Sequence, residues 1–122
     1  MRIVTKKVNL PAVVENVEKL ELEDMQSLVG GYIEHLDCGG LDLWLNEEGK
    51  LHGLAPNLVA FYGKEARDVI VGDVFFTAHD NDGETIGLTD EEIDNVFKRL
   101  GSMMIMHDGD GELVLAQSIE MK

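Results

Sequence analysis

Residues 68–80 have the sequence DVIVGDVFFTAHD, a run rich in β-branched and aromatic residues. Such residues fit the pleated, half-buried surface of a sheet, so the run predicts one central strand. Gly72 interrupts it, and an isolated glycine within a strand is typical of a β-bulge. We therefore expect a single strand with a bulge at Gly72.

Shorter strands are predicted on the N-terminal side of this run. MRIVTKK (1–7) and AVVENVE (12–18) flank a turn at Pro11, which excludes a continuous helix. YIEHLD (32–37) and LDLWLN (41–46) flank the glycine-rich CGG and predict a hairpin. In the second of these strands leucines alternate with polar residues and Trp44, which indicates one buried face.

One helix is predicted before the hairpin and an irregular segment after it. Leu22, Met25 and Val29 recur at helical spacing, and Gly30 follows as a stop residue. The segment LAPNLVAFYG (54–63) is ambiguous, and we expect one irregular helical turn after its proline.

The second helix is predicted within LTDEEIDNVFKRLG (88–101). Thr89 and Glu92 have the spacing of a capping box, acids occupy the first turn, and Lys98 and Arg99 occupy the last. Gly101 is expected to end the helix. Its apolar stripe comprises Ile93, Val96, Phe97 and Leu100.

The last strands complete the predicted architecture. MMIMH (103–107) and ELVLAQSI (112–119) flank DGDG, which predicts a C-terminal hairpin. Strands and helices do not alternate regularly, so the fold class is α+β, one domain with a mainly antiparallel sheet and two principal helices. We expect residues 1–100 to form the core and residues 101–122 a hairpin extension packed on the same domain.

A six-residue pattern occurs twice, as HDNDGE (79–84) and HDGDGE (107–112). A calcium loop needs acids at its first, third and fifth positions, glycine at the sixth and glutamate at the twelfth. Neither copy supplies a carboxylate at the first or twelfth position, and neither is flanked by two helices. Asp-Gly is a strong hairpin-turn signal, so we expect two tight turns and no metal site.

Acidic residues dominate the composition. Lys and Arg number 10 against 24 Asp and Glu, a formal net charge of −14. The negative electrostatic field of such a protein repels nucleic acid and anionic membranes and attracts basic surfaces. No Lys or Arg lies between Asp68 and Phe97. We expect a partner-binding face with these residues: Asp80, Asp82, Glu84, Asp90, Glu91, Glu92 and Asp94. Trp44 is a further candidate, since it either packs under a second layer or marks a partner surface.

Catalytic signals are weak. The chain has no nucleotide-binding loop, no metalloprotease motif and no nucleophile elbow, and its four histidines are scattered. The single cysteine, Cys38, excludes an internal disulfide and suits a reducing compartment. A catalytic role for it is the weaker alternative, because nothing adjacent in sequence lowers its pKa. We expect no enzyme, no catalytic residue and no cofactor, and a soluble protein of the bacterial cytoplasm.

Four blocks in order, VGGYIEHL, NEEGKLHGLAPN, DVIVGDVFFTA and LTDEEID, resemble a family of small proteins carried by phages, plasmids and integrated elements. This is the family known as domain of unknown function thirty-eight forty-six. The resemblance covers roughly residues 25–94. Ala55 stands where the family usually has proline, and Pro56 follows one place later.

This resemblance implies a setting in which genes directed against host immunity are common. We expect an inhibitor, of the anti-CRISPR or another anti-defence kind, that binds a host defence or nucleic-acid-handling protein with a basic surface. The alternatives are a small-ligand binder that sequesters a nucleotide signal and a non-inhibitory accessory protein. A homo-oligomer is a further alternative, and the C-terminal extension leaves both the oligomeric state and the choice of target open.

Overall fold

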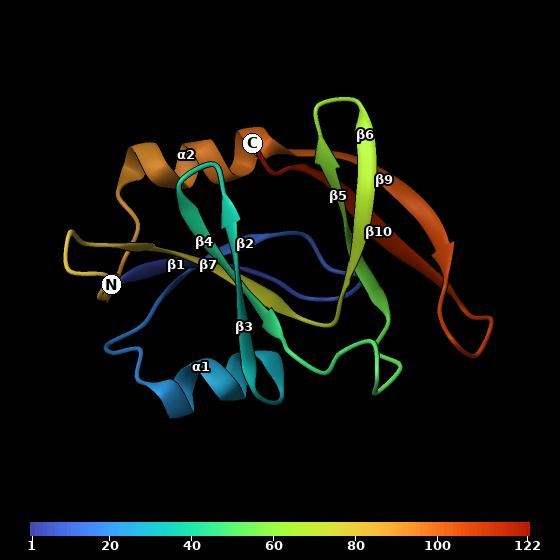
Figure 1. The fold of residues 1–122 in the computed structure, drawn as a ribbon, viewed down its shortest axis with the longest axis horizontal. Coiled ribbons are helices and arrows are strands. Elements are labelled where there is room, and N and C mark those ends of the chain that lie inside the picture. Colours follow the sequence, from blue (N-terminus) through green and yellow to red (C-terminus); the bar gives the residue numbers. More distant parts are fainter.

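The computed structural model describes residues 1–122 and contains ten strands and two helices (Figure 1). Their bounds in chain order are β1 (Arg2–Lys6), β2 (Val13–Asn16), α1 (Leu22–Val29), β3 (Ile33–Cys38), β4 (Leu41–Asn46), β5 (Pro56–Tyr62), β6 (Glu65–Val71), β7 (Val74–His79), β8 (Thr85–Ile86), α2 (Asp90–Arg99), β9 (Leu100–His107) and β10 (Leu113–Glu120). Neither helix is long and apolar enough to span a membrane.

The strands form two sheets. Sheet A has the order β2-β1-β7-β4-β3, with β8 paired to the end of β7, and sheet B has the order β6-β5-β10-β9. Every pairing is antiparallel except that of β5 with β10. The predicted α+β fold with a mainly antiparallel sheet, two helices and a C-terminal hairpin is confirmed.

Residues 68–80 do not form one strand, so that prediction was wrong. The chain leaves β6 in sheet B, turns at Gly72 and enters β7 at the centre of sheet A. Gly72 has a φ of 80°, which favours glycine, and its N–H donates to the carbonyl of Ala55. The glycine therefore marks a change of sheet, which a bulge in a single strand would not produce.

The segment after Pro56 was also predicted incorrectly. It forms the seven-residue strand β5 between β6 and β10, with no helical turn. Leu58, Val59 and Ala60 are all buried, because both faces of this strand are covered. A continuous apolar run of this length does not show the two-residue alternation that distinguishes a half-buried strand.

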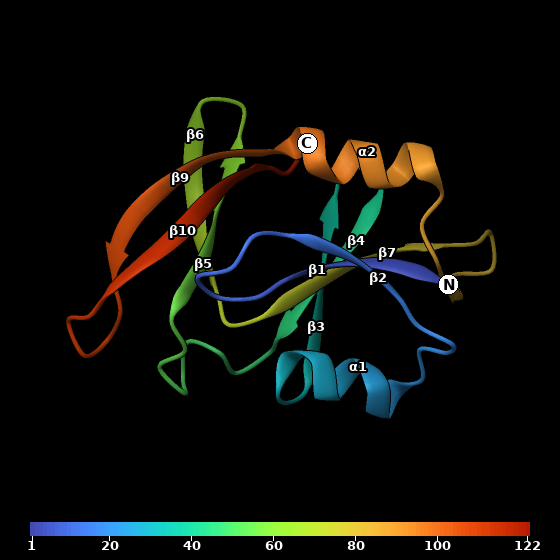
Figure 2. The same cartoon turned by 180° about the vertical axis from the view of Figure 1, so that it is seen from behind.

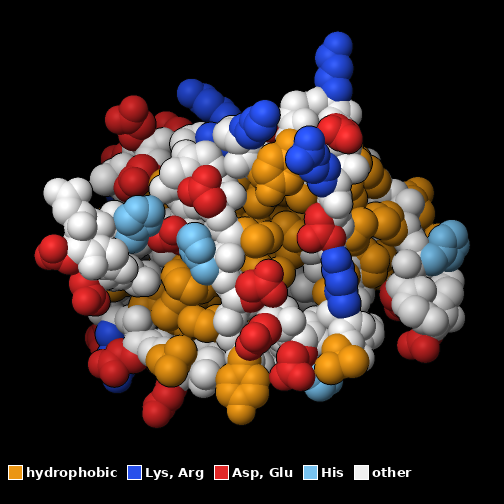
Figure 3. Space-filling view, in the orientation of Figure 1, with side chains coloured by type: hydrophobic (Ala, Val, Ile, Leu, Met, Phe, Trp, Pro, Cys, Tyr) orange, Lys and Arg blue, Asp and Glu red, His pale blue; other side chains and the backbone are white.

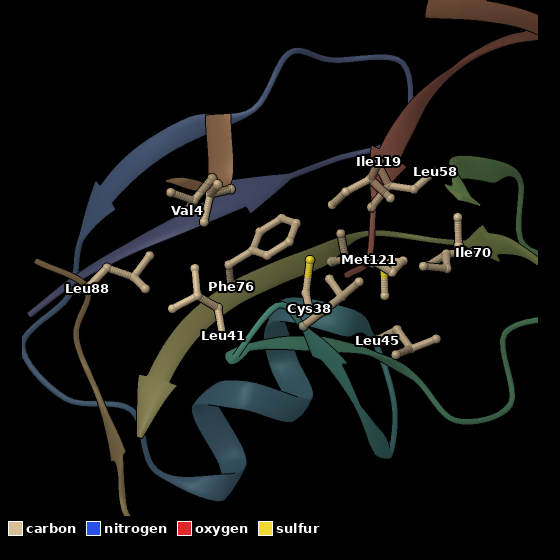
Figure 4. Packing of buried hydrophobic residues seen from close by; sticks show 14 of the residues in the cluster. Val4, Cys38, Leu41, Leu45, Leu58, Ile70, Phe76, Leu88, Ile119 and Met121 are labelled. Carbon is tan, nitrogen blue, oxygen red and sulfur yellow. The ribbon is translucent and has the colours of Figure 1, made fainter. Parts of the chain in front are cut away.

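Two hydrophobic clusters fill the space between the layers. The larger lies between sheet A, sheet B and α2, and Figure 4 shows part of it. The smaller lies between α1 and the opposite face of sheet A, and contains Ile3, Met25, Val29 and Phe75. Figures 1 and 2 show α1 and α2 on opposite sides of sheet A. Central strands are consequently buried on both faces, whereas one buried face was predicted for β4.

A buried polar link joins the two sheets. The Lys6 side chain on β1 is fully buried, and its Nζ donates to Asn57 Oδ1 on β5 at 2.9 Å and to the Lys7 carbonyl at 3.2 Å. Asn57 Nδ2 donates to the carbonyls of Lys6 and Gly72, both at 2.8 Å. Burial lowers the pKa of Lys6, although the charge of Asp73 opposes this.

The start of α2 and the end of α1 follow the local sequence, whereas the predicted stop of α2 at Gly101 was wrong. Thr89 Oγ1 accepts from the Glu92 N–H, and Glu92 Oε1 accepts from the Thr89 N–H, which confirms the capping box. Gly30 ends α1 in the left-handed conformation. The helix α2 ends at Arg99, and Leu100 already belongs to β9, so the chain passes from helix to strand without a glycine stop.

Candidate partner-binding surface

The two copies of the H-D-x-D-G-E pattern adopt the same turn. In the first, Asp80 Oδ1 accepts from the N–H groups of Asp82 and Glu84, each at 2.9 Å. In the second, Asp108 Oδ1 accepts from the N–H groups of Asp110 and Glu112 at the same distances. The glycine of each copy has a φ of 82°. The first turn joins β7 to β8 and the second joins β9 to β10, so the predicted pair of hairpin turns is confirmed.

The first aspartate of each pattern therefore stabilises its own backbone. A carboxylate that accepts two amide N–H bonds holds the turn in shape and has less capacity to bind a ligand. No group of three or more His, Cys, Asp or Glu side chains has the arrangement needed to hold a metal ion.

The structure brings the predicted acidic residues together at one end of the molecule. The β7–β8 turn is followed after β8 by the first turn of α2, and both lie at the same end in Figures 1 and 2. We call these two segments, residues 80–84 and 90–94, the acidic end. In Figure 3 this side of the molecule shows acidic side chains and two neighbouring histidines, whereas most Lys and Arg side chains lie elsewhere.

Some acidic residues at this end already have partners. Asp80 holds its turn, Glu92 belongs to the capping box, and Asp90 forms an ion pair with Arg2. The remaining carboxylates are exposed and form no ion pair or side-chain hydrogen bond: Asp82, Glu84, Glu91 and Asp94. They come from two segments at the same end of the molecule, which therefore carries unpaired negative charge.

A histidine–aspartate cluster adjoins the acidic end. Asp42 on β4 is buried, and its carboxylate interacts with His35 Nε2 at 2.7 Å and with His79 Nδ1 at 3.0 Å. Its hydrogen bond raises the pKa of His79, and the charges of Asp42, Asp37 and Asp80 add to this effect. The imidazole of His79 is nearly half exposed, so a proton on it is accessible from solvent.

Sequence reasoning missed this cluster because the histidines lie on different strands. Alternation along β4 places Asp42 on the polar side of its strand, which is the only signal that sequence offers. The neighbour relation between β4 and β7, which pairs Asp42 with Thr77, arises from the tertiary fold.

Trp44 packs against His35 and Phe75 on sheet A. Its ring stacks on Phe75 with a centroid separation of 6.3 Å, and its Nε1 donates to Thr77 Oγ1 at 2.9 Å. It packs against the α1-side cluster, which is the first of its two predicted roles. Whether its remaining exposed surface contacts a partner stays a prediction.

Cys38 is a buried thiol. Its burial raises the pKa to about 11, although Arg99 partly opposes this effect. A thiol with this pKa is almost fully protonated at neutral pH and is a poor nucleophile. The structure therefore gives Cys38 a packing position in the larger cluster.

Residues 1–101 match the family model described as Domain of unknown function (DUF3846). The chain belongs to this family. No curated protein matches the chain, and no solved structure matches it. The family match covers the acidic end, the histidine–aspartate cluster and the Lys6–Asn57 link, while nearly all of the β9–β10 hairpin lies beyond it.

Proposed function

We propose that this DUF3846 protein binds a basic surface of another protein through its acidic end. The partner is a host defence or nucleic-acid-handling protein, and binding blocks its basic surface. The observation that supports the proposal is the convergence of unpaired, exposed carboxylates from the β7–β8 turn and α2. The family's occurrence on mobile elements, noted from the sequence resemblance, fits a role against host immunity.

Electrostatics supports this mode of action. A protein with a formal net charge of −14 is repelled by nucleic acid and is steered toward the basic grooves in which nucleic acid binds. Exposed charges that are free of intramolecular partners increase the association rate more than paired charges do, and salt screens their effect. The inhibitor would then compete for the same basic surface as the nucleic acid.

The repeated turn supplies a matched control for this proposal. Asp82 and Glu84 occupy the same positions in the first turn as Asp110 and Glu112 occupy in the second. Figure 1 shows the two turns at opposite ends of the molecule. Reversal to lysine in either turn changes the net charge equally and leaves the turn-forming aspartate intact.

The experiment captures proteins from host lysate with three baits: wild type, Asp82→Lys/Glu84→Lys and Asp110→Lys/Glu112→Lys. We expect a basic protein that binds wild type and the second variant but is lost with the first. Its association with wild type should slow as salt increases. If the two variants lose the same proteins to the same extent, binding follows net charge alone and the acidic end is not the site.

A further inference from the structure

The strand β9 is a free edge of sheet B. It is the last strand in the order β6-β5-β10-β9, so only one of its edges is paired. Figures 1 and 2 both show it at the outer margin of the molecule. Its eight residues span about 27 Å at the usual rise per residue, which is long enough for a second strand to pair along it.

Beyond the register shift near its start, where pairing with β10 passes from Leu100–Ile119 to Met103–Gln117, this edge lacks the features that normally prevent strands from pairing between molecules. Proteins protect free edges with charged side chains, proline or very short strands. The other edge strands follow that rule, since β2 carries Glu15, β3 carries Glu34 and Asp37, and β6 carries Glu65 and Arg67. In contrast, β9 has the sequence LGSMMIMH, with no Lys, Arg, Asp, Glu or proline.

The hairpin face next to this edge is also apolar and exposed. Ile105 pairs with Leu115 across the hairpin, and Leu113 and Met103 lie on the same face. Ile105 is 71% exposed and Leu113 is 64% exposed. Large apolar side chains that are adjacent and exposed indicate a surface that another molecule covers on binding.

The two ends of β9 carry opposite charges. Lys98 and Arg99 end α2 immediately before β9, and Asp108, Asp110 and Glu112 follow it in the turn. Lys98 is exposed and forms no ion pair, and the same holds for Asp110 and Glu112. When two copies of β9 run antiparallel, the basic end of each lies beside the acidic turn of the other.

We propose that β9 pairs with β9 of a second copy of this chain, antiparallel across a two-fold axis, so that sheet B continues from one copy into the other. The opposite charges at the two ends of β9 favour a second copy as the occupant of this edge. Two copies that each carry −14 repel one another over most of their surface. The β9 edge is uncharged along its length and self-complementary at its ends, and two-fold symmetry forms each of these contacts twice.

The first test measures the mass of the full chain in solution by light scattering after size exclusion, over a range of concentrations. Wild type should reach twice its 13.5 kDa chain mass. Ile105→Glu should remain at the chain mass, since it places like charges near the two-fold axis. Leu51→Glu is the matched control, because Leu51 is 80% exposed and lies outside sheet B, and it should behave as wild type.

The second test uses the charged ends of the strand. Lys98→Glu alone and Asp110→Lys/Glu112→Lys alone should each be monomeric, because each brings like charges together at both ends. A mixture of the two variants should form a heterodimer, since both contacts are then between opposite charges. A monomeric wild type, a dimer that persists in Ile105→Glu, or a mixture that stays monomeric would each overturn the proposal. These results are independent of the acidic end, because each single chain carries both segments of that end. For the same reason, a monomeric Asp110→Lys/Glu112→Lys variant still serves as the control for partner capture.

Discussion

The link between Lys6 and Asn57 allows a prediction of stability. Replacing Asn57 with alanine removes the partner of a buried ammonium group and the donor to two buried carbonyls. A hydrogen bond to a charged group contributes about 1.5–3 kcal/mol, and each neutral one contributes about 0.5–1.5 kcal/mol. We therefore expect Asn57→Ala to lower the free energy of unfolding by about 2.5–6 kcal/mol.

This loss is large for a domain of this length, since the total stability of such domains is about 5–15 kcal/mol. Thermal unfolding monitored by circular dichroism should show a Tm lower by about 10–24 °C, at about 4 °C per kcal/mol. Asn81→Ala is the control, because Asn81 is exposed in the first turn and its side chain forms no hydrogen bond. Its effect should be within about 0.5 kcal/mol.

A double-mutant cycle tests the cause. In Asn57→Ala the Lys6 ammonium keeps only the Lys7 carbonyl, so Lys6→Met in that background should restore part of the lost stability. If Asn57→Ala lowers stability by less than about 1 kcal/mol, or if the two substitutions are simply additive, then the link does not stabilise the fold in this way.

Three further predictions concern titration and turn structure. The pKa of Lys6 is lowered from 10.5, so between the folded pKa and pH 10.5 the unfolded chain holds a proton that the folded chain has released. The Tm of wild type should therefore rise with pH in that range, whereas the Tm of Lys6→Met should not. The pKa of His79 is raised from 6.5, so its contribution to stability is complete below that pH and disappears as pH rises through the folded pKa. His79→Gln should therefore flatten the Tm profile above pH 6.5. Asp80→Ala should lower the free energy of unfolding by about 1–2 kcal/mol through loss of two hydrogen bonds, whereas Asp82→Ala should change it by less than about 0.5 kcal/mol in urea titrations.

Local sequence patterns predicted the elements whose geometry is set within a few residues. The capping box of Thr89 and Glu92 spans one helical turn, and each Asp-Gly turn is closed by bonds from residues two and four positions later. These interactions form between neighbours in the sequence, so residue type and spacing determine them. The same reasoning located the hairpin of β3 and β4.

Features that depend on contacts between distant residues were not predicted. Lys6 and Asn57 are 51 positions apart, and Asp42 and His79 are 37 positions apart. The run through Gly72 was predicted as one strand because β-branched residues occur on both sides of the glycine. Only the presence of two sheets explains why the chain turns there, and residue types along one segment do not determine which sheet each strand joins.

The repeated six-residue pattern shows how one local structure can serve two different surfaces. Both copies form the same turn, so each exposes the same pair of acids at its second aspartate and its glutamate. The first turn lies at the same end of the molecule as the acidic first turn of α2, so its carboxylates make the electrostatic potential there more negative. The second lies at the end of an edge strand that has no Lys, Arg, Asp or Glu and whose other end follows Lys98. In the proposed dimer, the same carboxylates lie beside Lys98 of the second copy. The backbone conformation therefore follows from the pattern itself, whereas the partner that each turn attracts depends on the charges that the fold places around it.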